Sequence, residues 1–435
     1  PARRSSDLVY GAALALGSQG VMDGVLAFSD GERALTYRGF VCEIDHARIG
    51  TAEFAQTVSS VKPAVKRNAW IVDHVISSSS GTLTARARFE VDGGALRMAW
   101  TLPGQSPDAR GAPRFTKLGI GAASEKVGRF YAGFGNVVEQ PGDLRLSGGG
   151  FMLSTRHIGV DYPNGLSLLQ ACDIFPDHAI HESRLQRLAL ETQHDATFMF
   201  VPSTKGAFDA ARAYAQITGF EKGRGVDNVL GRMCIDQWGG DYTDAARALE
   251  LAGKYGLQHS VFVKHVWQRW GYDYRLPEIY PPQGGLEPFV AMRQAAEKAG
   301  MLFCPHDNYI DFYPDAADYS YDHICFSEEG QPIRAWYNKG RGALSYRWAP
   351  HAFRPWLKEN MRLMRRNFSP DALFIDVFTA IAPFDYYDRE GTFHPRMETQ
   401  QAWRDAFDTS RSLLKSGSTM ISEAEIGRAS CRERV

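Results

Sequence analysis

Two acidic side chains stand where apolar runs end, and their positions could support chemistry. The stretch 372–380 (ALFIDVFTA) carries Asp376, and the stretch 418–423 (STMISE) ends in Glu423. Because a carboxylate is costly to bury inside a strand, each acid is expected where its strand ends. Two carboxylates on successive strands are the minimum that cleavage of a glycosidic bond requires.

Further polar and aromatic residues follow three other apolar runs, at 232–235, 260–263 and 301–304. Carboxylates hold hydroxyl pairs, and indole faces cover the apolar side of a pyranose. Because a (β/α) barrel keeps its chemistry at the carboxyl ends of its strands, these residues are expected on one rim with the two acids. The residues predicted to bind substrate are Asp236, Trp238, Lys264, His265, Trp267, His306, Asp307 and, from a long loop, Arg347.

Each rim residue also has a plainer interpretation. Asp236 or Asp307 alone is typical of a cap for the following helix or loop. Lys264 and His265 are compatible with salt bridges on the rim. Asp236, His306 and Asp307 are ligand types for a divalent metal, but no fixed spacing supports a metal site. No metal or organic cofactor is predicted.

The elements that must position these residues alternate between strand and helix after residue 226. Gly256 and Gly300 follow two of the expected helices, as glycine commonly does. This alternation favours a parallel βα array. A full barrel takes about 250 residues, so five strands predict an incomplete (β/α)8 barrel over 226–424. The expected helices cover 244–255, 287–299, 354–367 and 398–415.

The first half of the chain predicts a different architecture. Alternating runs at 83–91 and 96–102, joined by Asp92-Gly93-Gly94, indicate a hairpin with one buried face. Many short strands of this kind predict a β-sandwich over 1–205. The segment 206–225 is expected to hold a linker helix and a glycine-rich linker.

Composition limits the classes of partner. With 435 residues, two domains are expected, and 44% hydrophobic residues suffice for both cores. The net charge of -1 gives no reason to expect nucleic acid or an anionic membrane. A carbohydrate is the expected partner. The six cysteines show no CxxC spacing, and neither the oligomeric state nor the compartment is predicted.

The last residues, 425–435, are expected to be a non-native tail, because their sequence resembles the translated read-through of a sequencing adapter. On this interpretation the barrel is truncated near residue 424.

The two acidic strands resemble those of glycoside hydrolase families 129 and 101. The matching residues are Leu373-Phe-Ile-Asp376-Val-Phe378 and, one helix later, Ile421-Ser-Glu423. The resemblance implies a β-sandwich before a (β/α) barrel and retaining cleavage of α-linked N-acetylgalactosamine. It also implies that Asp376 is the nucleophile and Glu423 the general acid/base. The spacing suits family 129 better, while Phe378 departs from the pattern expected in family 101.

Two other classes of function remain as alternatives. A non-catalytic carbohydrate-binding protein would use the same rim without cleaving the sugar. A lyase or epimerase would need an arginine-rich pocket, for which Arg347 is the one evident candidate, so it ranks last.

Overall fold

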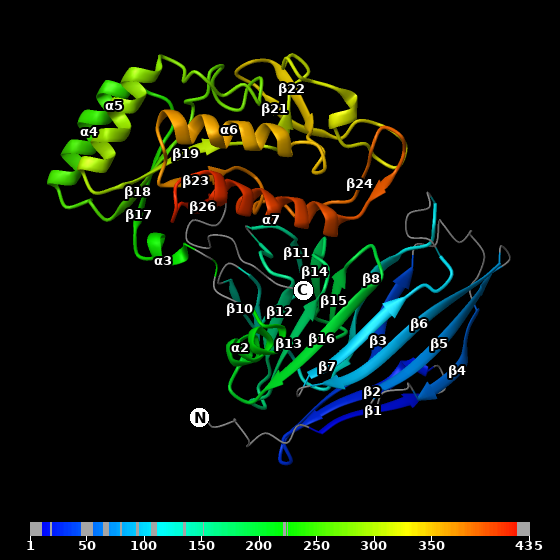
Figure 1. The fold of residues 1–435 in the computed structure, drawn as a ribbon. Coiled ribbons are helices and arrows are strands. Elements are labelled where there is room, and N and C mark those ends of the chain that lie inside the picture. Colours follow the sequence, from blue (N-terminus) through cyan, green and yellow to red (C-terminus); the bar gives the residue numbers. More distant parts are fainter. Residues whose placement is uncertain are drawn as a thin grey trace. The chain divides into compact units, whose positions relative to one another are not determined.

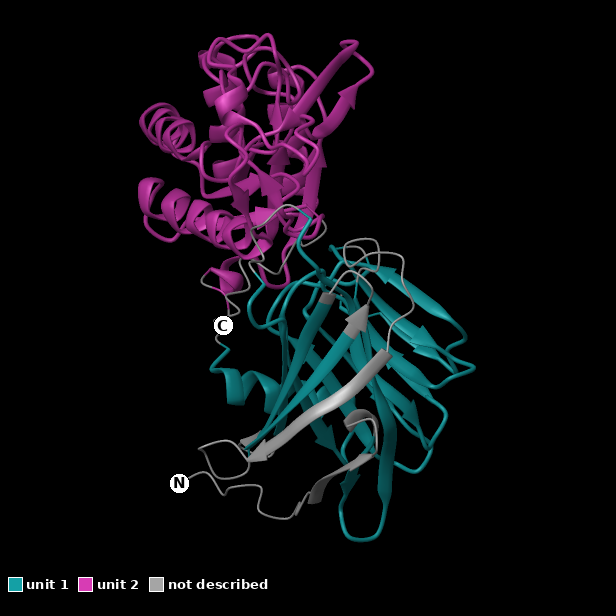
Figure 2. Ribbon diagram, turned by 90° about the vertical axis from the view of Figure 1, so that its right-hand side faces the viewer, with its two compact units in different colours: residues 1–220, 434–435 teal, residues 221–433 magenta. Residues whose placement is uncertain are grey.

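The structure is a computed structural model that describes residues 11–17, 20–44, 55–63, 69–78, 81–92, 95–105, 111–133, 136–150, 152–220, 223 and 225–423. The chain divides into two compact units between residues 220 and 221 (Figure 2). The predicted non-native tail at 425–435 lies outside the described residues.

The first unit contains two antiparallel sheets that pack face to face (Figure 1). Trp100 of one sheet meets Phe115 of the other with ring centroids 6.1 Å apart, and both rings are buried. One sheet has the order β1 (Gly11–Gly17), β2 (Gly20–Ser29), β3 (Ala34–Ile44), β8 (Phe115–Ala123), β15 (Arg187–Glu191), β14 (His178–Glu182), β11 (Leu144–Ser147). The other has the order β10 (Val137–Glu139), β9 (Arg129–Tyr131), β12 (His157–Asp161), β13 (Ser167–Cys172), β16 (Ala196–Ser203), β7 (Ala95–Thr101), β6 (Gly81–Asp92), β5 (Ala69–Ser78), β4 (Ala55–Pro63).

The predicted hairpin is confirmed by the antiparallel pairing of β6 with β7, in which Asp92 is opposite Ala95. Leu83, Ala85, Ala87 and Phe89 of β6 are buried, as the alternation of the sequence predicts.

Helix α2 (Ala207–Thr218), which was expected in the linker, packs on the first unit instead. Its buried residues Ala207, Ala210 and Tyr214 lie on one helix face, because they are three or four positions apart. Ala210 and Tyr214 share an apolar cluster with Leu169 and Val201 of the nine-stranded sheet.

The second unit contains a five-stranded parallel sheet whose strands follow one another in chain order (Figure 1). All five predicted strands and the four helices between and beside them are confirmed. The described strands form an open sheet, so closure into an eight-stranded barrel stays a prediction. The strands are β17 (Met233–Gln237), β18 (Ser260–Lys264), β19 (Leu302–Asp307), β23 (Ala372–Ile375) and β26 (Thr419–Ser422). The helices are α3 (Val226–Val229), α4 (Tyr242–Lys254), α5 (Leu286–Lys298), α6 (Arg354–Asn367) and α7 (Arg396–Leu413).

Both faces of this parallel sheet are apolar, as βα connections require. Phe262, Phe303 and Leu373 pack in the larger cluster that includes the helices. Val263 and Phe374, which point to the other face, pack in a second cluster. Local signals fix the helix ends; for example, the Asp241 side chain accepts hydrogen bonds from the first turn of α4.

Two small sheets and a short 3-10 helix occupy the long loops. The three-stranded sheet has the order β20-β22-β21 and lies in the segment between β19 and α6. The elements of these loops are β20 (Asp311–Phe312), β21 (Arg334–Asn338), β22 (Ala343–Arg347), β24 (Tyr386–Tyr387), β25 (Phe393–His394) and the 3-10 helix Tyr321–His323.

Among the described residues, no helix has the length and apolar character needed to cross a membrane.

Candidate active site

The two acids singled out by the sequence lie at the ends of neighbouring parallel strands. Asp376 directly follows β23, Glu423 directly follows β26, and these strands pair along their length. The Asp376 N–H donates to the Asp307 carbonyl at 2.9 Å, which fixes the backbone at the strand end. Asp376 is buried and Glu423 is half-buried. The charge of Asp376 acts on the pKa of Glu423, so the two carboxyl groups lie near each other.

His306 lies between the carboxylates of Asp273 and Asp376. Its Nε2 is 3.3 Å from Asp376 Oδ2, and its Nδ1 is 3.6 Å from Asp273 Oδ1. Burial alone would lower the pKa of His306, but Asp273 and Asp376 raise this pKa to about 9. His306 is therefore an imidazolium ion at neutral pH.

The two acids have opposite pKa shifts. Burial alone would raise the pKa of Asp376, but the charge of His306 and its hydrogen bond hold this pKa below the ordinary value. Burial, together with the charge of Asp376, raises the pKa of Glu423 to about 6. Near neutral pH, Asp376 is therefore ionised, while Glu423 is poised to exchange a proton.

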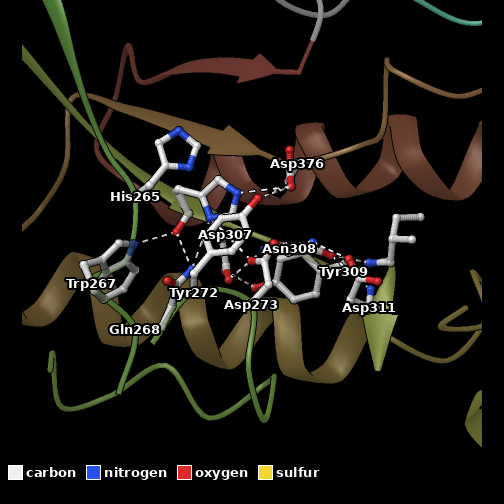
Figure 3. Close-up of polar contacts among 12 residues, drawn as sticks. His265, Trp267, Gln268, Tyr272, Asp273, Asp307, Asn308, Tyr309, Asp311 and Asp376 are labelled. Carbon is white, nitrogen blue, oxygen red and sulfur yellow. Dashed lines mark hydrogen bonds and ion pairs between the residues drawn. The ribbon is translucent and has the colours of Figure 1, made fainter. Parts of the chain in front are cut away.

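A buried hydrogen-bonded framework holds the back of the site (Figure 3). Asn308 Nδ2 donates to Asp273 Oδ2 at 3.0 Å and to Asp311 Oδ2 at 2.8 Å. Burial raises the pKa of both carboxyl groups. The Tyr309 hydroxyl donates to Asp307 Oδ2 at 2.6 Å. Since these groups are fixed by one another, the framework holds His306 in place.

Aromatic rings form a wall beside Asp376. The Tyr272 hydroxyl donates to Asp376 Oδ2 at 3.3 Å. The Tyr272 ring meets Trp238 at 4.8 Å and Trp336 at 5.7 Å between centroids. Trp238 is 57% exposed and Trp336 is 41% exposed. Such exposed indoles next to a carboxylate suit the apolar face of a sugar.

Trp238 is held in place from two sides. Its Nε1 donates to Asp236 Oδ2 at 2.9 Å, and its ring stacks on His265 with centroids 4.2 Å apart. Asp236 Oδ1 lies 2.8 Å from His265 Nε2. Burial and the nearby charge of His306 lower the pKa of His265 to about 3, so this imidazole is neutral.

Two valines next to the site have an unusual backbone conformation. Val266 follows His265 with a φ of 53°, and Val377 follows Asp376 with a φ of 67°. The left-handed region is costly for β-branched residues and is found where the surrounding structure imposes it.

Three side chains are also spaced so that they could hold a metal ion. One ligand atom from each of Asp273, His306 and Asp376 lies within 4.8 Å of the others. A protonated imidazole cannot be a ligand, so a metal would have to displace the proton that His306 carries. With that proton in place, the imidazolium of His306 pairs with the two carboxylates at 3.3 and 3.6 Å.

Comparison with known proteins gives a match at the level of the fold. No protein-family model and no curated protein matches the chain. An α-N-acetylgalactosaminidase from Bifidobacterium bifidum, solved in complex with GalNAc, matches with a TM-score of 0.74 and 12% identity over 95% of this chain and 76% of that chain. A family 31 sulfoquinovosidase from E. rectale matches with a TM-score of 0.55 and 13% identity over 94% of this chain and 66% of that chain. An α-galactosidase from Thermus thermophilus matches with a TM-score of 0.51 and 13% identity over 82% of this chain and 71% of that chain.

The chain therefore shares its fold with glycoside hydrolases. At 12–13% identity these matches establish the architecture, and the choice of family and substrate has to rest on the site itself.

Three of the predicted substrate-binding residues have buried side chains that are engaged with the protein itself. Trp267 has no exposed surface, packs on Phe289 and donates its Nε1–H to the His306 carbonyl at 2.6 Å. Lys264 is buried, and its ammonium group donates to the Gly239 carbonyl. Asp307 is buried under Tyr309. Direct contact of these three residues with a sugar stays a prediction, and their burial speaks against it, because a position near a strand end does not fix which way the side chain points.

Four of the other predicted rim residues take part in the contacts around the two acids, and the fifth, Arg347, contacts a different ring. Asp236, Trp238, His265 and His306 belong to the ring and ion contacts described above. Arg347, on β22, places its guanidinium over the Phe384 ring at 4.3 Å, and its role in binding stays a prediction.

Sequence reasoning missed the residues that loops bring into the site, namely Tyr272, Asp273, Asn308, Asp311 and Trp336. One signal was present in the sequence: the segment 270–274 (WGYDY) combines aromatic residues with an acid between a strand and its helix. No periodicity marks such a loop, so only its composition could have identified it.

Proposed function

We propose that this chain is a retaining α-glycosidase in which Asp376 is the nucleophile and Glu423 is the general acid/base. The observation that carries the proposal is the pairing of these acids at adjacent strand ends with opposite pKa shifts. A retaining enzyme needs one ionised carboxylate and one carboxyl group that donates a proton, about 5 Å apart.

In the proposed reaction, Asp376 attacks the anomeric carbon and forms a glycosyl ester. The glycosidic bond breaks, its electron pair stays on the leaving oxygen, and Glu423 gives that oxygen a proton. Glu423, now a carboxylate, takes a proton from water, and the hydroxide attacks the anomeric carbon to release Asp376 and the sugar. Tyr272 and His306 both contact Oδ2 of Asp376, so we assign the attack to Oδ1.

The proposed substrate is an α-linked N-acetylgalactosaminide. The resemblance of the two acidic strands to glycoside hydrolase family 129 supports this choice, as does the likeness of the fold to an α-N-acetylgalactosaminidase. The exposed rings of Trp238 and Trp336 support a pocket that holds a pyranose.

The test is hydrolysis of a panel of p-nitrophenyl α- and β-glycosides by the wild type, Asp376→Asn and Glu423→Gln. We expect cleavage of the α-N-acetylgalactosaminide and a loss of at least about 1000-fold in the Asp376→Asn variant, because nucleophilic catalysis is removed. Asp241→Ala, which removes a helix cap in the same unit, is the matched control.

Proton NMR of the first product distinguishes the mechanism. Release of the α-anomer supports retention, whereas release of the β-anomer contradicts it. Binding of N-acetylgalactosamine without any turnover of the panel favours the alternative of a non-catalytic carbohydrate-binding protein.

A further inference from the structure

Strand β21, which carries Trp336, is irregular at that residue. Arg334 pairs with Tyr346 and Tyr337 pairs with Leu344, so β21 advances three residues while β22 advances two. One extra residue in one strand is a β-bulge, a feature that redirects side chains next to active sites. The exposure of the side chains agrees with a bulge. Trp336 and Tyr337 are both exposed, whereas successive side chains of a regular strand point to opposite faces.

Ser345 of β22 holds this bulge. Its Oγ accepts a hydrogen bond from the Trp336 N–H at 2.9 Å and lies 2.6 Å from Asp311 Oδ1. The Trp336 carbonyl is also 3.1 Å from Oγ. The Ser345 hydroxyl can donate one hydrogen bond, and a carboxylate is a stronger acceptor than a carbonyl. We therefore infer that Ser345 donates to Asp311.

The same chain of hydrogen bonds leads to the nucleophile. Asp311 is bound by Asn308, which also binds Asp273, the partner of His306. His306 in turn contacts Asp376. At the other end, the Trp336 ring meets Tyr272, whose hydroxyl also bonds to Asp376. Two routes therefore connect Trp336 to Asp376. One runs from the Trp336 ring through Tyr272, and the other runs from the Trp336 backbone through Ser345 and the buried framework.

We propose that Ser345 is a positioning residue: its hydroxyl, anchored by Asp311, fixes the bulge that aims Trp336 at the substrate. The proposal rests on the proposed function, because it assigns to Trp336 a wall of the same pocket. Ser345 has no exposed surface, so the proposal assigns it an indirect effect on the substrate that runs through Trp336.

The test is a double-mutant cycle with Ser345→Ala, Trp336→Ala and the combined variant, measured with p-nitrophenyl α-N-acetylgalactosaminide. We expect Ser345→Ala to raise KM about three- to tenfold, the loss that one buried hydrogen bond typically causes, with a smaller change in kcat. In the Trp336→Ala background, Ser345→Ala should change KM less than about twofold. Ser345→Thr, which keeps the hydroxyl group, should restore most of the wild-type KM.

An equal rise in KM in both backgrounds would overturn the proposal, because Ser345 would then act independently of Trp336. A second measurement does not depend on activity. The fluorescence of Trp336 is obtained as the difference between a protein that contains this residue and its Trp336→Phe variant. Quenching of this difference signal by acrylamide reports the exposure of the Trp336 indole. The measurement is made with and without Ser345→Ala. We expect the quenching to change by at least about 1.5-fold, since a freed bulge alters exposure; unchanged quenching overturns the proposal. If the wild type cleaves no glycoside while the quenching changes, the proposed function fails and the positioning role stands.

Discussion

Replacing His306 by glutamine tests the electrostatics of the site most directly. The pKa of His306 is raised from 6.5 to about 9 although burial acts in the opposite direction. The net shift corresponds to about 3 kcal/mol, and the attraction from Asp273, Asp376 and Asp307 exceeds this value because it also offsets the cost of burial. Glutamine keeps a hydrogen-bond donor but has no charge, so Asp376 loses its share of that attraction.

The expected result is an upward shift of the acid limb of kcat/KM. If Asp376 holds close to half of the attraction, its pKa rises in His306→Gln, and the acid limb moves up by at least about one pH unit. The assay is hydrolysis of p-nitrophenyl α-N-acetylgalactosaminide from pH 3 to pH 9, with thermal unfolding as the check that the variant folds.

His265→Gln is the matched control, because His265 is a buried imidazole of the same site that is neutral in this pH range. Its substitution should move the acid limb less than His306→Gln does, because His306 contributes more than His265 to the lowered pKa of Asp376. An acid limb that stays at the wild-type pH in a folded His306→Gln variant would refute the assignment of charge to His306.

Three further predictions concern single residues. The alkaline limb of kcat/KM should lie near pH 6, because Glu423 must be protonated to donate and its pKa is raised to about 6; a limb that persists in Glu423→Gln contradicts this role. Trp267→Ala should lower the free energy of unfolding by about 3–5 kcal/mol in a urea titration, because it empties a buried core position. Asp241→Ala should cost about 1 kcal/mol in the same titration and leave kcat unchanged, since it removes only the α4 cap; a change in kcat greater than about twofold would contradict this.

The sequence was sufficient for the elements and for the two acids. Apolar runs of four to six residues, separated by helical periodicity, predicted β23 and β26 and the positions of Asp376 and Glu423 after them. Apolar periodicity carries this information because burial of one face is the main force that forms each element.

The sequence was not sufficient for the residues that surround the acids. Trp267 and His265 lie two positions apart after the same strand, yet one enters the core and the other faces Asp236. Val266 between them adopts a left-handed conformation that no local pattern indicates. Tyr272 and Asp273 come from a loop without periodicity, so their contacts depend on tertiary packing alone.

The conformations of Val266 and Val377 have a consequence for the stability of the second unit. Each left-handed valine costs about 1–2 kcal/mol, a substantial part of the 5–15 kcal/mol that typically separates a folded domain from its unfolded chain. The packing around these two strand ends therefore has to offset a local cost that glycine would largely avoid.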